Sequence, residues 1–197
     1  NFGCAAGELR RRPNARNSRP GVSLTLAYRP PYDATGVLAL FQRHCVDGLE
    51  QVDGTHWRRA LRTENGAADI RVDLEDGALG LSARLTDNRD LMPVVTALRR
   101  MFDLDAQPAE IADCLVKDSL LAPHIKARPG VRSPVFASPF EACVRAILGQ
   151  QVSTAAARRQ CANIVAAANS RTRIDSRSVL LFPTPAELLA LPEEVLR

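Results

Sequence analysis

The chain has 197 residues, 46% of them hydrophobic and 24% charged, which is enough for one large globular domain or two small ones. With 26 Lys and Arg against 22 Asp and Glu, the formal net charge of +4 favours anionic partners only weakly. No apolar run approaches the roughly 18 residues of a membrane span, and no secretory signal is visible. We therefore expect a cytoplasmic protein with no membrane partner.

The five cysteines and three histidines are scattered along the chain. Their spacing contains no C-x-x-C pair, so it favours neither a disulfide framework nor a zinc site, and we expect no metal. Lys117 and Lys126 are the only lysines, which leaves arginine as the dominant cation. The planar fork of arginine suits phosphate contacts, although a GC-rich coding sequence would produce the same bias.

The first half of the chain reads as a small domain of strands and helices. Residues 1–21 are polar and rich in Arg, Pro and Gly, which predicts a basic tail or linker. Alternation over residues 22–28 predicts a half-buried strand that ends at Pro30-Pro31, and Asp33 caps a predicted helix with apolar positions to Cys45. Three further strands are predicted around Trp57–Leu61, Ile70–Leu74 and Leu79–Leu85, with a turn at Asp76-Gly77 and a helix at Asn88–Phe102.

After residue 104 the strand patterns disappear and helix starts take their place. Pro108 opens a short helix, and a second short segment covers residues 120–126. Helix caps are predicted at Ser138, with Glu141 completing a capping box, at Ser153, and at Thr184 with Glu187, and Pro192 begins a last helix. Residues 169–178 read as a polar loop. The fold class is therefore α+β, with an antiparallel-sheet domain over residues 22–103 and an incomplete all-α domain over residues 104–197.

The segment Arg145–Ser153 is the most informative part of the chain. It closes one helix, places Gln150 and Gln151 at its end, and opens the next helix at Ser153. Such a corner exposes polar side chains together with free helix-start amides, which can meet a phosphate backbone and insert a side chain into a duplex.

A series of motifs resembles the DNA-3-methyladenine glycosylase II family, the alkylation-repair branch of the helix-hairpin-helix glycosylases. Any single motif is weak, whereas the order and spacing of the whole series are specific, and the series covers about nine-tenths of the chain. The matching segments are Tyr28–Asp33, Gly48–Val52 with Trp57–Arg59, Met101–Ala106, Ala127–Arg132, Pro139–Glu141, Arg145–Ser153 and Phe182–Pro185.

The resemblance implies hydrolysis of the N-glycosidic bond of alkylated purines such as 3-methyladenine in double-stranded DNA, without a cofactor, by a monomeric enzyme of base-excision repair. Such an enzyme extracts the damaged nucleotide, and a wedge side chain fills the gap. The wedge position is Gln151, although both glutamines could instead only solvate a helix end. The implied DNA-binding residues are Gln150, Gln151, Val152, Ser153, Arg145 and Arg128. Arg132 and Arg158 are further candidates for phosphate contact.

The implied base pocket departs from the family pattern in its composition. The family places an aromatic side chain on the first helix to stack on the cationic base, and the matching position here is Leu40, with Phe41 beside it. Leu40 departs from the family pattern, and Phe41 fits the protein core as well as a pocket wall.

The catalytic carboxylate is not assigned to any residue of this chain. In the family it follows a Gly-rich hairpin, whereas Gly149 is the only glycine after Gly130. We expect that the chain ends before this hairpin, is a fragment of a longer protein, and is inactive alone.

A second resemblance concerns residues 1–12, which look like the end of an AraC-type helix-turn-helix domain of the kind fused to glycosylases in adaptive-response proteins. It leaves open an alternative function, a non-catalytic DNA-binding or regulatory segment of a transcriptional activator. An ordinary basic tail would also explain these residues. A pseudoenzyme that recognises damage without cleaving is a third alternative.

Overall fold

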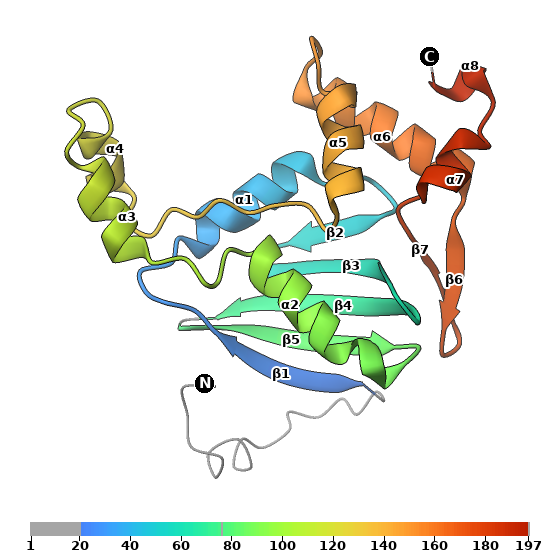
Figure 1. The fold of residues 1–197 in the computed structure, drawn as a ribbon, viewed down its shortest axis with the longest axis horizontal. Coiled ribbons are helices and arrows are strands. Elements are labelled where there is room, and N and C mark those ends of the chain that lie inside the picture. The colour runs from blue at the N-terminus through green and yellow to red at the C-terminus, as the bar shows by residue number, and fades with distance from the viewer. Residues whose placement is uncertain (1–20, 76, 197) are drawn as a thin grey trace.

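The structure is a computed structural model that describes residues 21–75 and 77–196. An antiparallel sheet carries helices on one side, and a mostly helical second half lies at one end of it (Figure 1). The strand order is β1 (Val22–Ala27), β5 (Ala78–Leu85), β4 (Gly66–Glu75), β3 (His56–Thr63) and β2 (Glu50–Asp53), each antiparallel to its neighbour. The turn residue Asp76 lies outside the described residues.

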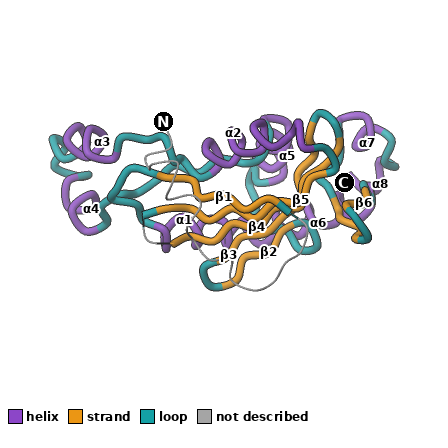
Figure 2. Tube along the Cα trace, turned by 90° about the horizontal axis from the view of Figure 1, so that it is seen from below, coloured by secondary structure: helices purple, strands orange, loops and turns teal. Residues whose placement is uncertain are grey.

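Two helices cover the inner face of this sheet. Helix α1 (Ala34–His44) contacts β2 and β3, and helix α2 (Leu91–Met101) follows the short 3-10 turn Asn88–Asp90 and lies along the sheet in Figure 2. The side chain of Asp33 accepts a hydrogen bond from Gly36 N at 2.8 Å, which confirms the predicted cap.

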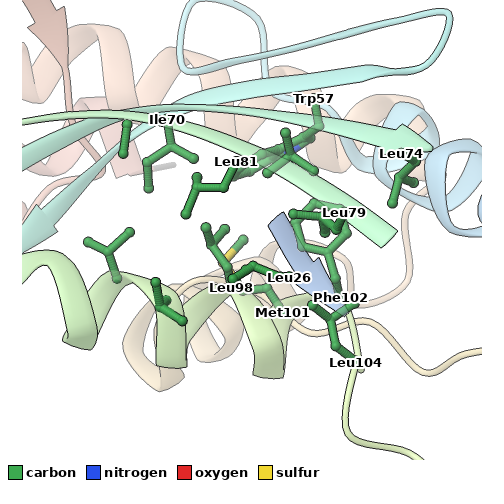
Figure 3. Close-up of a cluster of buried hydrophobic side chains, with 14 of the residues drawn as sticks. Leu26, Trp57, Ile70, Leu74, Leu79, Leu81, Leu98, Met101, Phe102 and Leu104 are labelled. Carbon is green, nitrogen blue, oxygen red and sulfur yellow. The ribbon is translucent and has the colours of Figure 1, made fainter. Parts of the chain in front are cut away.

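The core between sheet and helices contains both aromatic and aliphatic side chains, and Figure 3 shows Trp57 and Phe102 beside Leu79 and Leu104. The ring of Phe41 lies 5.7 Å from that of Trp57 and 4.8 Å from that of Phe102, both tilted, which is a favourable arrangement for aromatic quadrupoles. All three side chains are buried. Phe41 is therefore a core residue, and its place in the base pocket stays a prediction.

The second half begins with helices α3 (Pro108–Leu115) and α4 (Ala122–Ala127), which project from the sheet in Figure 1. Helix α5 (Pro139–Leu148) then packs near α6 (Thr154–Ala168), and α7 (Pro185–Leu189) and α8 (Glu193–Leu196) follow. No helix among the described residues is long and apolar enough to cross a membrane.

The α+β class is confirmed, but the second half is not purely helical. Residues 169–178, predicted as a loop, contribute to a hairpin of β6 (Arg171–Ile174) and β7 (Arg177–Leu180). Ile174 and Leu181 are buried against Ala60 and Ala67 on the outer face of the sheet. The two strands are four residues each, too short for the alternation of Thr172 and Ile174 to be distinguished from a polar loop.

The domain boundary predicted between residues 103 and 104 stays a prediction, because packing crosses it. One cluster of buried residues joins Val46 and Leu49 to Val144, Cys161 and Phe182. The two halves of the described chain therefore share apolar surface.

The segment around Gly130 joins two of the motifs that were far apart in the sequence. Gly130 has φ +80° and its carbonyl accepts a hydrogen bond from Asp33 N at 2.9 Å. A Cβ atom at Gly130 would lie 2.5 Å from the carbonyl carbon of Pro31, which is closer than real Cβ atoms approach backbone. Only glycine fits between the two segments.

We expect Gly130→Ala to lower the free energy of unfolding by roughly 2–4 kcal/mol, because positive φ and backbone overlap act together. Gly54→Ala is the matched control: its φ is +55° and nothing lies within 4 Å of the added carbon, so only the cost of positive φ remains. Urea unfolding of both variants measures the difference. Equal losses would show that the contact with Pro31 contributes nothing.

Candidate nucleic-acid interface

The turn between α5 and α6 carries the two predicted glutamines at its tip and points away from the sheet (Figure 1). Gln151 has φ +60°, in the left-handed region that non-glycine residues rarely adopt. Gly149 in the same turn has φ −84°, so the conformation that glycine would tolerate falls on a glutamine instead. Strain of this kind persists where the surrounding structure holds it and is concentrated at functional sites.

The surface of this turn is exposed and partly apolar. Gln150, Gln151 and Ser153 are exposed, and no hydrogen bond from either glutamine side chain reaches another described residue. Ile147 is 66% exposed and Val152 is 41% exposed, which places apolar surface beside the two amides. The turn therefore offers both amide groups and apolar groups to a partner.

Ser153 is the N-cap of α6, as predicted. Its hydroxyl accepts a hydrogen bond from Ala156 N at 3.2 Å, and its carbonyl accepts from Ala157 N at 2.9 Å. The amides of Thr154 and Ala155 have no partner within the helix, since the first turn of a helix lacks preceding carbonyls. These amides carry the positive end of the helix dipole and suit an anion.

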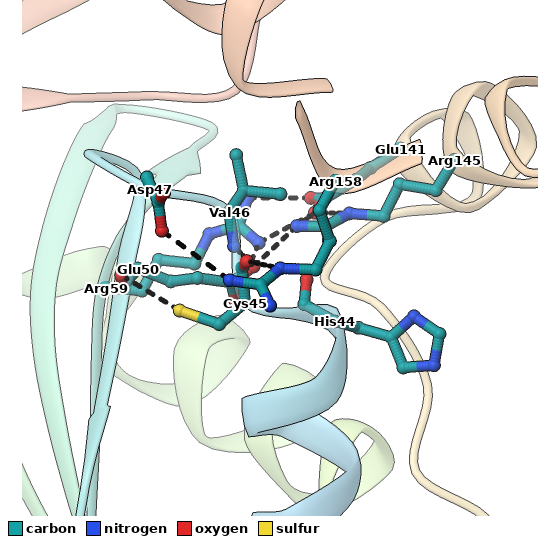
Figure 4. Close-up of polar contacts among 9 residues, drawn as sticks. All are labelled: His44, Cys45, Val46, Asp47, Glu50, Arg59, Glu141, Arg145 and Arg158. Carbon is teal, nitrogen blue, oxygen red and sulfur yellow. Dashed lines mark hydrogen bonds and ion pairs between the residues drawn. The ribbon is translucent and has the colours of Figure 1, made fainter. Parts of the chain in front are cut away.

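A buried cluster of charges beneath the turn fixes α5 to the sheet (Figure 4). Arg59 on β3 donates two hydrogen bonds to Glu141 on α5, Nη1 to Oε1 at 2.7 Å and Nη2 to Oε2 at 2.6 Å. Both side chains are at most 3% exposed. This bidentate geometry fixes direction as well as distance.

Arg145, one helical turn after Glu141, completes the cluster. Its guanidinium donates to Glu141 at 2.8 Å, to Glu50 on β2 at 2.7 Å, and to the carbonyl of His44 at 2.7 Å. Two arginines therefore face two glutamates, and the buried charges balance. The predicted phosphate contact of Arg145 is wrong, because its side chain is only 8% exposed and its guanidinium is held by these partners.

Protonation in the cluster follows from these contacts. Burial alone would raise the pKa of Glu141, but the charges and hydrogen bonds of Arg59 and Arg145 outweigh burial and hold the pKa below its ordinary value. Burial likewise opposes the charge of Arg145, while Glu50 and Glu141 raise its pKa. Glu141 and Arg145 are thus both charged at neutral pH.

The side chain of Glu141 does not take the capping role that the sequence predicts. Ser138 caps α5 by accepting from Glu141 N at 3.1 Å, but the carboxylate of Glu141 is committed to the two arginines and does not return to Ser138. The predicted capping box is therefore only half formed. The box at Thr184 and Glu187 is complete, as predicted.

The remaining predicted arginines have internal partners. Arg128 is 61% exposed at its side chain and pairs with Asp33. Arg132 is buried and donates to the carbonyls of Arg29 and Pro31, so its candidate role in phosphate contact is wrong. Arg158 on α6 donates to the carbonyl of Cys45 at 2.6 Å, which ties the helix after the turn to the end of α1.

The two base-pocket candidates lie in different surroundings: Phe41 is in the core, whereas Leu40 is only half-buried. Leu40 is half-buried on α1, one turn before His44, whose ring meets that of Phe136 edge-on at 6.2 Å. The guanidinium of Arg145 lies 4.6 Å from the centre of the Phe136 ring. Sequence reasoning missed Phe136, because a single aromatic residue in an irregular segment carries no periodic signal.

Sequence reasoning also missed Glu50, Arg59 and Glu141 as positioning residues. One signal was present: the alternation of β3 places Arg59 on the same face as Trp57 and Leu61, where a charge needs a buried partner. Within the described residues no group of His, Cys, Asp or Glu has the arrangement of a metal site.

Comparison with known protein families shows to which family the chain belongs. The model of the AlkA N-terminal domain matches residues 23–138, more than half of the chain. The chain belongs to the AlkA N-terminal domain family. The matched range covers the sheet, α1 to α4, and the segment that leads to Ser138.

Two relatives extend the AlkA relationship beyond that range. The chain is 36% identical over 154 residues to the probable bifunctional transcriptional activator/DNA repair enzyme AlkA of Mycobacterium tuberculosis, covering 78% of this chain and 31% of that protein. It is 29% identical over 175 residues to DNA-3-methyladenine glycosylase 2 of Escherichia coli, covering 88% of this chain and 60% of that protein. The matched part of the chain thus spans 31% and 60% of the length of these two relatives.

The AlkA-type fold is also recognised in a solved structure. The 3-methyladenine DNA-glycosylase from Archaeoglobus fulgidus superposes with a TM-score of 0.76 at 21% identity, over 88% of this chain and 60% of that one. At this identity the likeness supports the overall arrangement of helices and strands.

We expect Glu141→Gln to lower the free energy of unfolding by about 3–5 kcal/mol at pH 7, because it leaves Arg59 and Arg145 buried beside a neutral group. The folded-state pKa of Glu141 lies below its ordinary value of 4.5, so the stabilisation is present above that pH and lost as the pH falls through the folded pKa. The difference in free energy of unfolding between variant and parent should therefore become smaller below pH 4.5.

Denaturant titrations from pH 3 to pH 8 measure this difference. Glu110→Gln, at the exposed first turn of α3, is the control and should cost less than about 1 kcal/mol. A small loss of stability in Glu141→Gln, or a loss that stays equally large at low pH, would contradict the conclusion that Glu141 is ionised in the cluster.

Proposed function

We propose that this chain is the DNA-recognising part of an alkylbase DNA glycosylase, whose reaction is hydrolysis of the N-glycosidic bond of alkylated purines such as 3-methyladenine. The observation that carries the proposal is the strained, exposed turn at Gln150 and Gln151, held on the buried Arg59–Glu141 pair. Membership of the AlkA N-terminal domain family supports the same function.

In the proposed mechanism the turn enters the duplex where a damaged nucleotide leaves the stack. Gln151 fills the gap and donates or accepts hydrogen bonds with the orphaned base, while Gln150 and Val152 contact its neighbours. The start of α6 at Ser153 holds a phosphate with its free amides. Because α5 is tied to β2 and β3, insertion does not displace the turn.

The extruded base is proposed to lie near Leu40, His44 and Phe136. An alkylated purine such as 3-methyladenine is cationic and stacks favourably on an aromatic face. Burial and the charge of Arg145 lower the pKa of His44, so its ring is neutral at pH 7 and does not repel a cationic base. Arg128, exposed beside Asp33, remains a proposed phosphate contact.

Bond cleavage requires a carboxylate facing the sugar as it gains positive charge. Among the described residues after the turn, Glu187 is held by Ser170, Thr184 and Arg62, and Asp175 lies in the β6–β7 turn, away from the α5–α6 turn in Figure 1. Glu193 and Glu194 lie in the first turn of α8, where acidic side chains stabilise a helix start. We therefore propose that the described part of the chain recognises damage but does not cleave.

The proposed partner is duplex DNA with alkylated bases, bound by a monomer in the bacterial cytosol without metal or other cofactor. The alternative of a purely regulatory segment rests on residues 1–12, which lie outside the described residues. No described feature favours it over the glycosylase function.

We expect Gln151→Gly to raise the free energy of unfolding by about 1 kcal/mol, because it removes a side chain from positive φ. The same change should lower affinity for a duplex with an abasic-site analogue about tenfold, since the wedge is lost. Fluorescence anisotropy and urea unfolding measure the two effects on one protein.

Asn169→Gly is the matched control, since Asn169 has φ +45° at the other end of α6. It removes a side chain from the same backbone region and should leave DNA affinity unchanged. If Gln151→Gly leaves the affinity for the abasic-site duplex unchanged, the wedge proposal is contradicted.

We also expect the purified 197-residue chain to release no 3-methyladenine from methylated duplex DNA, because none of its assigned residues supplies the carboxylate. The E. coli relative DNA-3-methyladenine glycosylase 2 serves as the positive control in the same chromatographic assay. Release above the uncatalysed rate would mean that a carboxylate of this chain is catalytic.

A further inference from the structure

The outer face of the sheet carries a groove that the proposed function does not use. It has a volume of about 500 Å³ and crosses strands β1, β3, β4 and β5 to reach β7 of the hairpin. Its charged lining consists of Arg58, Arg71, Arg84 and Arg177 against the single carboxylate of Asp69. The lining therefore has a strong excess of positive charge.

The strand register concentrates these charges instead of separating them. Arg58 on β3 lies directly opposite Arg71 on β4, a pairing of like charges that is unfavourable in an isolated sheet. Each is only partly neutralised from the side: Arg58 donates to Asp69 at 2.7 Å, and Arg71 donates to Asp73 at 3.0 Å. Both side chains remain more than a third exposed, so each can also contact a ligand in the groove.

Two further arginines of the groove have no partner among the described residues. Arg84 on β5 lies opposite Asp69, but that carboxylate is already committed to Arg58. Arg177 at the start of β7 also forms no hydrogen bond or ion pair with a described residue. These two cations are available without breaking an internal contact.

The wall that carries Arg177 is firmly attached. The β6–β7 hairpin buries Ile174 and Leu181 against Ala60 and Ala67, so the side of the groove is anchored through apolar contacts with the sheet. The groove is consequently a formed concavity and does not depend on a ligand to assemble it.

We propose that this groove binds the sugar-phosphate backbone of a DNA strand. Arginine and serine side chains both contact phosphate oxygens, and Ser23 and Ser82 line the groove together with the four arginines. No aromatic side chain lines the groove, so bases cannot stack on it. Binding there would depend on the charge of the strand and not on its base sequence.

This surface is separate from the α5–α6 turn. Arg59, which holds α5, points to the inner face of the sheet, whereas its neighbour Arg58 points outward into the groove. A strand in the groove therefore contacts the opposite face from the one that supports the turn. The groove adds non-specific affinity for DNA and does not depend on the proposed function of Gln151.

The test is the salt dependence of binding to undamaged DNA by the complete 197-residue chain. Each phosphate contact contributes about 0.9 to the slope of log K against log salt for a duplex and about 0.7 for a single strand. Arg84→Ser with Arg177→Ser should therefore reduce the slope by about 1.8 on duplex and about 1.4 on single-stranded DNA. Arg84→Lys with Arg177→Lys keeps the charges and should retain most of the slope.

The charge-matched control is Arg89→Ser with Lys117→Ser, two exposed cations outside the groove. An equal loss of slope in this control, or no loss in the groove variant, would overturn the proposal. So would a groove variant that keeps its DNA slope but loses affinity for polyglutamate, since the groove would then take an acidic peptide. Gln151→Gly removes no charge and should leave the slope on undamaged DNA unchanged. The proposals for the groove and for the wedge can therefore be rejected separately.

Discussion

A buried, charge-balanced cluster is the interaction on which the rest of this structure depends. Arg59 and Glu50 come from adjacent strands, whereas Glu141 and Arg145 come from one helix more than 80 residues later. Removing charges from water is expensive, and it is tolerated only where geometry and hydrogen bonds compensate. Such a cluster forms in one arrangement and loses its compensation in others. It therefore determines where α5 sits on the sheet.

The position of α5 in turn decides what the α5–α6 turn can do. The backbone of Gln151 is held in a region that an unconstrained glutamine would leave, and Arg158 ties the following helix to the end of α1. Both helices beside the turn are thus anchored independently of the turn itself. A rigid, exposed tip suits insertion into a duplex, because little conformational freedom is lost on binding.

The two faces of the sheet are used in different ways. The inner face packs the aromatic core and holds the helix that carries the turn, and the outer face gathers arginines beside the β6–β7 hairpin. Strand alternation makes this division possible, since neighbouring residues such as Arg58 and Arg59 point to opposite sides. One short strand therefore contributes both to the placement of the wedge and to a separate basic surface.

The sequence by itself determined the elements whose signals are local: the alternating strands of the sheet, the caps at Asp33, Ser153 and Thr184, and the polar corner at Gln150 and Gln151. Only the tertiary structure decided what depends on distant partners. It placed Phe41 in the core, took Arg145 and Arg132 out of reach of phosphate, and gave Glu141 a buried partner in place of a capping role. It also folded residues 171–180 into a hairpin, because the apolar surface that holds Ile174 belongs to strands more than 100 residues earlier. Periodicity and capping arise within a few residues, whereas burial and ion pairing are properties of contacts that a linear pattern does not contain.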